Sequence, residues 1–485
     1  MKQIILNPSN PRYKTHESGM IIGKKTIEST IFDVIVFCSR EVKSVTIPNF
    51  IKTIESYSFS ECKQLTNVEF QEDSQLEIIK KSAFLGSQLF TFTIPPHLKR
   101  ICQGAFEYCD TLFNFTIPKN SELEVIEKQF LYSTPIRHLS LPSSLIELKS
   151  GWCCGLSCLN SIDIDVNNPR FKIYEDGIII GKSSVDSEVY DMFMFCLRRI
   201  KNVQIPDFIK IIGPYAFSES RIESFIVPPQ ITHICESAFL SCNNLQTFEI
   251  PKNSQLKSIE NNAFEWSRIT NLFIPSGLID LKEDWCYAVK IKEINVSANN
   301  QRYRMYGSKM VIGKSSIEKL NYDVLVFCAR DIEKVRIPSF IKKINPYSLH
   351  YCYKFNTVEF QENSQLETIE KFAFSCSSIR KIEFPQNLKK IGQDAFSSCS
   401  QLQCVEINKN SQIQIIDNNA FSWTFIESFT VPPQIKIINI NAFYNCRKLK
   451  IIEFSDNSQI QLNSIYPFLG CKNALIMIPV KLKCL

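Results

Sequence analysis

The stretch IEFPQNLKKIGQDAFSSCSQL, which runs from Ile382 to Leu402, contains the whole of a motif that the rest of the chain repeats. Its first three residues alternate apolar, polar and apolar, as in a half-buried β-strand, and the proline after them marks the end of that strand. The segment from Ile391 to Phe396 has the spacing of a short helical or 3-10 turn, which would direct Ala395 and Phe396 to one side. One unit therefore predicts one strand, one turn and an apolar side that it cannot cover alone.

The Phe396 position recurs along the whole chain. Its equivalents are Phe59, Phe84, Phe106, Phe130, Trp152, Phe217, Phe239, Phe264, Trp285, Leu349, Phe374, Phe421, Phe443 and Phe468. From Leu349 onward the intervals alternate between 25 and 22 residues. Because no unit can bury its own apolar side, consecutive units must stack into one continuous core with a parallel sheet along one face. We therefore predict a leucine-rich-repeat solenoid, a mostly β repeat α/β fold, with a curved parallel sheet on one face and short 3-10 or helical turns and loops on the other.

A longer repeat is superimposed on the short one. The segments Asn10–Lys14, Asn168–Lys172 and Asn300–Arg304 lie 158 and then 132 residues apart, and several downstream residues keep those offsets. The sequence thus divides into three tandem blocks of one continuous solenoid, residues 1–164, 165–296 and 297–485. Each block opens with a hairpin-like island of about 40 residues that interrupts the stacking, at about residues 7–44, 165–202 and 297–334.

The second island contains IIIGKSS at Ile178–Ser184, which ends like a phosphate-binding loop. A complete loop of that kind needs a glycine five residues before Gly181, because that glycine opens the backbone around the phosphates. The position holds Asp176, whose carboxylate would repel phosphate. We therefore expect no nucleotide site, and we expect Gly-Lys-Ser to turn a hairpin whose return strand is DMFMFC, Asp191–Cys196.

Charge, hydropathy and motifs argue against several classes of function. The net charge of +6 is spread over 485 residues without a basic run, which argues against a nucleic-acid partner. The sequence has no apolar run of 18 residues or more, so it predicts no membrane-spanning helix. The five histidines occupy different phases of the repeat, and no motif of a known catalytic class is present. We predict a chain that is not an enzyme and that holds neither cofactor nor metal.

The nineteen cysteines follow the repeat instead of a ligand spacing. Seven fall three residues after the repeated aromatic position, Cys62, Cys109, Cys242, Cys352, Cys399, Cys446 and Cys471. A cysteine tied to a repeat phase is typical of a small buried apolar residue. The dense cluster of Cys153, Cys154 and Cys158 has no neighbouring histidine to complete a tetrahedral zinc site.

The combined motif resembles the BspA-like, Treponema-type leucine-rich repeats. VTIPNFIKTIESYSFSECKQL (Val45–Leu65) and Ile382–Leu402 carry it most clearly, and NPRFKIYEDGIIIG in the second island is similar to a longer variant repeat of that family. The resemblance covers essentially the whole chain. It implies a non-enzymatic surface antigen or adhesin, of the type known from oral bacteria and trichomonad parasites, which binds host proteins and other cells.

Two surfaces are candidates for binding. The middle residue of each strand triplet should face outward, which gives Thr46, Glu69, Thr93, Thr116, Ser140, Gln204, Ile226, Glu249, Phe273, Arg336, Glu359, Glu383, Glu406, Thr430 and Glu453. Ile226 and Phe273 could anchor a partner. Glu359, Glu383 and Glu406 fall on three successive strands, where they could form an acidic strip or be screened by Lys334 and Lys381. The islands carry in-register cations, Arg12, Lys24, Arg170, Lys182, Arg302 and Lys314. These could hold an anionic glycan or phosphate, or pair with in-register acids such as Asp191 and Asp323.

The sequence leaves location and assembly between alternatives. The family resemblance implies the cell surface, whereas MKQIILNPSNPRYK has no signal-peptide core, and free thiols fit an intracellular scaffold with the same fold. Apparent strands at Ile4–Leu6 and Ile476–Pro479 would leave unpaired edges, which predict end-to-end self-association or a truncated product. The partners we expect are proteins, including host surface or matrix proteins.

Overall fold

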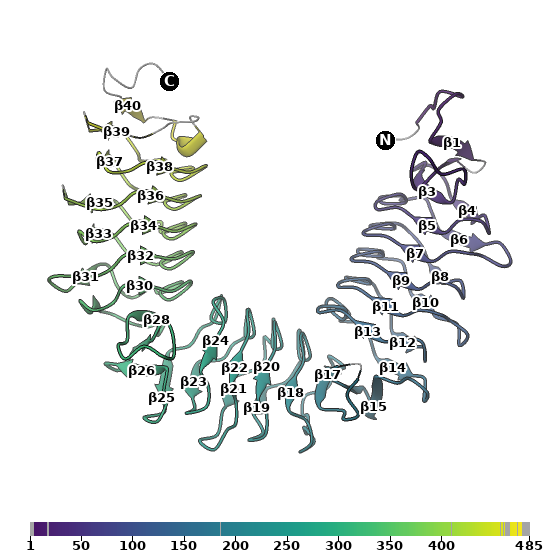
Figure 1. Ribbon diagram of the computed structural model, residues 1–485, viewed down its shortest axis with the longest axis horizontal. Helices are drawn as coiled ribbons and strands as arrows, with labels where there is room; N and C mark the ends of the chain where they lie inside the picture. Colours follow the sequence, from purple (N-terminus) through teal and green to yellow (C-terminus); the bar gives the residue numbers. More distant parts are fainter. Residues whose placement is uncertain are drawn as a thin grey trace. The chain divides into compact units, whose positions relative to one another are not determined.

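The computed structural model describes residues 4–16, 19–184, 186–408, 410–455, 457–458, 460, 466–472 and 474–477. The chain divides into two compact units, residues 1–223 with 233–244, and residues 224–232 with 245–485. Each unit is a succession of coils that contribute a short outer strand and a two-residue inner strand (Figure 1). The predicted leucine-rich-repeat solenoid is confirmed as a mostly β structure of stacked parallel strands.

Unit 1 contains two series of inner strands. The first is an eight-stranded sheet in the order β1 (Tyr13–His16), β2 (Met20–Gly23), β3 (Val34–Cys38), β5 (Thr53–Ile54), β7 (Ile78–Ile79), β9 (Arg100–Ile101), β11 (Val125–Ile126) and β13 (Glu147–Leu148). The second comprises β15 (Phe171–Glu175), β16 (Ile178–Gly181), β17 (Met192–Cys196), β18 (Ile211–Ile212) and β20 (His233–Ile234). The outer strands pair as β4 (Ser44–Ile47) with β6 (Asn67–Phe70), β8 (Thr91–Thr93) with β10 (Asn114–Thr116), and β12 (His138–Leu141) with β14 (Ser161–Ile164).

Unit 2 repeats the arrangement. Its eight-stranded inner sheet runs β26 (Tyr303–Tyr306), β27 (Met310–Gly313), β28 (Val324–Cys328), β30 (Lys343–Ile344), β32 (Thr368–Ile369), β34 (Lys390–Ile391), β36 (Ile415–Ile416) and β38 (Ile437–Ile438), and β22 (Ser258–Ile259) pairs with β24 (Asp280–Leu281). The outer groups are β19 (Ser224–Ile226) with β21 (Thr247–Glu249), β23 (Asn271–Ile274) with β25 (Glu293–Val296), β29 (Val335–Ile337) with β31 (Val358–Phe360), β33 (Lys381–Phe384) with β35 (Cys404–Ile407), and β37 (Ser428–Val431) with β39 (Ile451–Phe454) and β40 (Leu475–Met477). A 3-10 turn, η2, spans Tyr466–Phe468.

The repeated aromatic position forms a stacked column inside each unit, as the sequence predicts. In unit 1 the rings of Phe59 and Phe84 stack with centroids 4.8 Å apart. In unit 2 the Phe374–Phe396 and Phe396–Phe421 centroid distances are 4.9 and 5.3 Å. All of these side chains are fully buried, so the column is the core around which the coils close.

The segment before each aromatic residue matches the predicted helical or 3-10 turn only in part. Its first residue ends the two-residue inner strand, and the rest is a tight turn in which alternate N–H groups bond to the next coil. The N–H groups between them bond three residues back, as Ala83 N does to Lys80 O at 3.2 Å. Phe84 N donates to Ala105 O at 2.8 Å, where a helix would require a carbonyl four residues earlier in its own coil. Positive φ at Tyr57 (61°) and Ser82 (52°) also breaks helical geometry. The spacing is local, but the hydrogen bonds that decide the conformation join different coils.

The phase-locked cysteines have a structural function. Cys109 Sγ donates to Phe84 O at 3.1 Å, and Cys399 Sγ donates to Phe374 O at 3.0 Å, each reaching the preceding coil. Burial raises the pKa of Cys109 to about 11 and that of Cys399 to about 12, which keeps both thiols protonated for this bond. The prediction of small buried residues is confirmed for six of the seven; Cys471 is half-buried.

Of the two predicted terminal strands, only the C-terminal one is found among the described residues. Ile4–Leu6 lies outside any strand, because the first strand, β1, begins at Tyr13 and pairs with β2 of its own island. Ile476 and Met477 belong to β40, whose three side chains are exposed, while Ile478 and Pro479 fall outside the described residues. End-to-end association stays a prediction.

Candidate binding surfaces

Each island is an antiparallel meander whose last strand leads into the inner sheet. In the second island β15 pairs with β16 and β16 with β17, both antiparallel. A tight turn at Gly177, where φ is 76°, joins the first pair, and residues 182–191 join the second. The predicted hairpin and its DMFMFC return strand are therefore confirmed.

The Gly-Lys-Ser sequence binds a carboxylate of the chain itself. Ser183 donates its N–H to Asp191 Oδ1 and its hydroxyl to Asp191 Oδ2, both at 2.9 Å. Ser315 makes the same two bonds to Asp323, at 2.8 and 2.9 Å, and Lys319 Nζ adds a third at 2.8 Å. Burial alone would raise the pKa of Asp323, but the bonds from Lys319 and Ser315 outweigh it and lower the pKa. The aspartate accepts the bonds that a phosphate would need in a nucleotide site.

The predicted island arginines are engaged with backbone and rings. Arg170 Nη1 donates to Ile146 O at 2.7 Å, and Arg302 Nη1 donates to Ile279 O at 2.8 Å. Arg12 lies 5.4 Å from the centroid of the Tyr13 ring. In-register charge pairing is therefore wrong for Arg170 and Arg302, because the carbonyls of the preceding coil are nearer than any in-register carboxylate.

The predicted island lysines share a feature that the sequence reasoning missed. Each lies over an aromatic ring of its own island together with a second cation. The three sets are Lys24 and Lys14 over Phe32 at 5.0 and 4.4 Å, Lys182 and Lys172 over Tyr190 at 5.4 and 4.1 Å, and Lys314 and Arg304 over Tyr322 at 5.5 and 4.1 Å. Phe32, Tyr190 and Tyr322 keep the 158- and 132-residue offsets, so the in-register aromatic residues were a detectable signal. Anion binding here stays a prediction.

A second set of in-register arginines, Arg40, Arg198 and Arg330, fastens each island to the following coil. Arg330 is buried and donates to Ser348 O at 3.0 Å and to Cys286 O and Tyr347 O at 3.1 Å. Arg198 is buried and makes longer bonds of 3.4 Å to Cys153 O, Cys196 O and Ala216 O. The half-buried Arg40 donates to Cys38 O and Ser58 O at 2.8 and 2.9 Å. These arginines satisfy carbonyls where the island interrupts the regular ladder.

The strand-triplet side chains face outward, as predicted. Thr46, Glu69, Thr93, Thr116, Gln204, Ile226, Glu249, Arg336, Glu359, Glu383, Glu406, Thr430 and Glu453 are exposed, and Ser140 and Phe273 are half-buried. Paired strands place them side by side: Thr46 with Glu69 and Thr93 with Thr116 in unit 1. The regular spacing of about 5 Å between strands makes this face, which we call the strand face, a surface of ordered side-chain rows.

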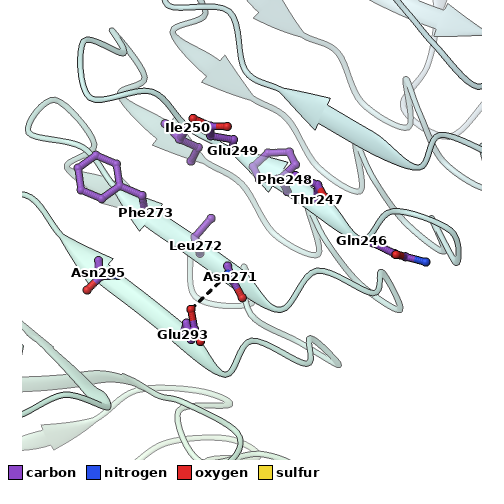
Figure 2. Close-up of a pocket in the computed structure, with 10 residues that line it drawn as sticks. All are labelled: Gln246, Thr247, Phe248, Glu249, Ile250, Asn271, Leu272, Phe273, Glu293 and Asn295. Atoms are coloured by element: carbon purple, nitrogen blue, oxygen red, sulfur yellow. Dashed lines mark hydrogen bonds between the residues drawn. The ribbon is translucent and has the colours of Figure 1, made fainter.

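The apolar part of the strand face lies in unit 2. Ile226, 62% exposed, pairs with Glu249, and Phe273 pairs with Asn295 on the next strand pair. Figure 2 shows Phe273 projecting from β23 beside a hollow of about 310 Å³ on β21, β23 and β25. Asn271 Nδ2 donates to Glu293 Oε2 at 3.3 Å along its edge. Ile226 and Phe273 are thus surrounded by side chains that are either polar and uncharged or acidic.

The predicted acidic strip is partly neutralised. Glu383 and Glu406 are directly paired across β33 and β35, but Lys381 Nζ lies 2.7 Å from Glu406 Oε1. Glu359 pairs with Arg336. The structure therefore favours screening by the predicted Lys381, and no ion pair of Lys334 is found among the described residues.

The repeat motif and its coil geometry agree with one family of leucine-rich repeats. The model for the BspA type leucine rich repeat region (6 copies) matches residues 29–158, 189–307, 321–450 and 414–485. The chain belongs to the BspA-type leucine-rich repeat family. The unmatched segments between these ranges are residues 159–188, which include β14, β15 and β16, and residues 308–320, which include β27 of the third island.

Several solved structures resemble this BspA-type chain. The pneumococcal vaccine antigen PcpA is 18% identical, with 78% of this chain and 82% of that one covered and a TM-score of 0.48. A leucine rich cell surface protein from Faecalibacterium prausnitzii A2-165 is 15% identical, with 98% and 96% covered and a TM-score of 0.42. A leucine-rich repeat protein from Bacteroides ovatus is 15% identical, with 97% and 92% covered and a TM-score of 0.30. We found no match among curated proteins.

The remaining site predictions concern metals and membranes. Cys153 and Cys154 are buried and Cys158 is exposed. Within the ranges that the structure describes, no group of three or more His, Cys, Asp or Glu side chains could hold a metal ion. In those same ranges, no helix has the length and apolar character needed to cross a membrane.

Proposed function

We propose that this BspA-type chain is a non-catalytic protein-binding module of the surface antigen or adhesin type. The observation that carries the proposal is the strand face of β19, β21, β23 and β25. Its backbone is paired within the ladders, and it presents Ile226 and Phe273 among polar side chains. An apolar anchor inside a polar rim is the composition of a protein interface.

The rigidity of the coils supports the same proposal. Leu272 and Phe248, which alternate with the outward residues, are buried, so the outward rows are held by the core beneath them. A partner that binds pre-ordered side chains loses little conformational entropy of the module. The printed names, a vaccine antigen for PcpA and a cell surface protein for the Faecalibacterium chain, agree with a protein of the surface antigen type.

The proposal is tested with partners captured from extracts of candidate host cells and matrix. Each captured protein is purified, and its affinity for the native chain is compared with that for Ile226→Glu/Phe273→Glu. We expect a loss of about tenfold or more, because truncating or charging a central anchor removes a hot spot. The matched control is Thr93→Glu/Thr116→Glu, which places two charges on the strand face of unit 1. Equal affinities for both variants and the native chain would contradict the proposal.

An intracellular scaffold is the second candidate function, since the repeat-phase cysteines serve as thiol donors to carbonyls in the preceding coil. Labelling intact cells with a membrane-impermeant amine reagent separates the two. A surface module is labelled on exposed lysines such as Lys290, whereas an internal scaffold is labelled only after lysis.

A further inference from the structure

Unit 2 contains an aromatic hollow away from the strand face, on the turns that follow the core aromatic column. It has a volume of about 510 Å³ and is lined by Trp266, Ala288, Val289, Tyr351 and Tyr353, with Lys290, Lys292, Arg330, Asp331 and Lys354 among the polar residues. Trp266 is 48% exposed and Tyr353 60% exposed. The volume lies in the range of pockets that hold a small molecule or one large side chain.

Ring contacts fix the walls of this aromatic hollow. Trp266 meets Tyr287 edge to face with centroids 6.4 Å apart, and Tyr351 lies 5.8 Å from Tyr353. His350, which is buried, links them, at 5.7 Å from Tyr287 and 4.1 Å from Tyr351. The aromatic surfaces are therefore ordered before any ligand arrives.

Two wall residues occupy backbone positions that do not favour them. Trp266 and Tyr351 both have a φ of 56°, in the left-handed region that suits glycine or asparagine. The same conformation recurs at this position of other coils, as at Tyr108, Glu219 and Trp423, so it is a property of the repeated turn that carries both rings.

The charge around the hollow is positive. Lys290 and Lys292 are exposed, and in the described part of the chain their Nζ atoms have no hydrogen-bond or ion-pair partner. Of the acids nearby, Asp331 lies 3.0 Å from Lys309 Nζ, and Glu333 lies 3.6 Å from Lys354 Nζ. Glu265 is half-buried and accepts a hydrogen bond from Trp266, and burial raises the pKa of its carboxyl. The hollow thus combines aromatic walls with the two unpaired cations Lys290 and Lys292 among its described lining residues.

We propose that this hollow is a second binding site, which takes one aromatic side chain from an acidic peptide segment of a partner protein. The aromatic side chain stacks between Trp266 and Tyr351, and carboxylates on either side of it pair with Lys290 and Lys292. The inference rests on the proposed function in one respect, that the partner is a protein. The aromatic hollow shares no lining residue with the hollow on the strand face, so the two sites can be tested separately.

The test uses a fluorescein-labelled heptapeptide, a tyrosine with three acidic residues on each side, titrated against the full chain by fluorescence anisotropy. We expect saturable binding that weakens with salt. Trp266→Gly and Tyr351→Gly should each reduce affinity about tenfold. Glycine adopts positive φ without strain, so these variants keep the turn. Lys290→Glu/Lys292→Glu should abolish binding.

Matched variants control for each change. Trp423→Gly removes a tryptophan of the same repeat position, 45% exposed with φ of 60°, and should leave the affinity unchanged. Lys252→Glu/Lys257→Glu controls for net charge. Ile226→Glu/Phe273→Glu should also bind the peptide normally, so failure of the strand-face proposal is distinguishable from failure of this one.

Four results would overturn the inference. They are absence of binding to the native chain at millimolar peptide, equal binding when the peptide tyrosine is replaced by alanine, equal binding when its acids are replaced by amides, and equal loss in Trp423→Gly and Trp266→Gly. The third would identify the hollow as a site for a neutral aromatic ligand.

Discussion

The second and third islands join the solenoid in the same way, yet the surfaces beside the two junctions differ. In both, a buried arginine, Arg198 or Arg330, donates to carbonyls of the coils on either side. At the second junction Glu219 accepts the N–H of Gly155 at 3.3 Å. The position 132 residues later is Tyr351, which lines the aromatic hollow. The backbone fastening is thus separate from the surface chemistry, so the repeated blocks can keep one while changing the other.

The arginine fastening should give the largest effect. Arg330→Met leaves several buried carbonyls without a donor, and we expect the free energy of unfolding to fall by about 3 kcal/mol or more. Arg198→Met, whose lost bonds are longer, should lower it by about 2 kcal/mol, and the half-buried Arg40→Met by about 1 kcal/mol because water can replace the donor. Urea denaturation followed by circular dichroism measures the series. Equal effects for Arg330 and Arg40 would contradict the fastening role.

His350 distinguishes the third junction from the second, where Ser218 stands at the matching position. Burial, followed by the nearby charge of Arg330, lowers the pKa of His350 from 6.5 to about 3, against the opposing bond of Nδ1 to Ser375 O. Below about pH 6.5 the unfolded chain therefore binds a proton at this histidine that the folded chain excludes. The free energy of unfolding falls as the pH is lowered through this range.

We expect this group to remove about 2 kcal/mol of stability between pH 7 and pH 5. His350→Ser should lose that part of the pH dependence, while any effect of other groups stays common to both proteins. Denaturation midpoints at the two pH values supply the comparison. A pH dependence that is unchanged in His350→Ser would show that folding does not lower the pKa of His350.

The smallest effect belongs to the carboxylate of the second junction. Burial, and next the charge of Glu219, raise the pKa of Cys154 to about 12. Glu219→Gln removes that charge, so the pKa of Cys154 should fall and its alkylation by iodoacetamide at pH 8.5 should become faster. Mass spectrometry reads the modification at Cys154, with the exposed Cys158 as an internal reference. An unchanged ratio of the two rates would mean that Glu219 does not act on this thiol.

The sequence was sufficient for the features that repeat. The stacked phenylalanines, the hairpin of the second island and the outward triplet residues all follow from spacing, because each depends on positions inside one unit or its neighbour. The turn before Phe84 was predicted only in part, because alternate N–H groups bond to carbonyls of the next coil, which local spacing does not show.

The candidate sites were only partly accessible to sequence reasoning. Ile226 and Phe273 were found because the strand face obeys a simple alternation. The aromatic hollow was not, because Trp266, Ala288 and Tyr351 come from different coils, and the repeat motif leaves the residue type at these turn positions open. The bonds of Ser183 to Asp191 likewise depend on how a ten-residue connection closes.

The central claim is that the strand face of unit 2 is a surface for binding proteins. The most direct measurement replaces Phe273 with the photo-crosslinking residue benzoylphenylalanine and compares it with the same replacement at Phe113, which is 52% exposed and precedes β10. On irradiation with a captured partner, the account predicts a crosslinked product from position 273 and none from position 113. No product from position 273, or equal products from both, would contradict it.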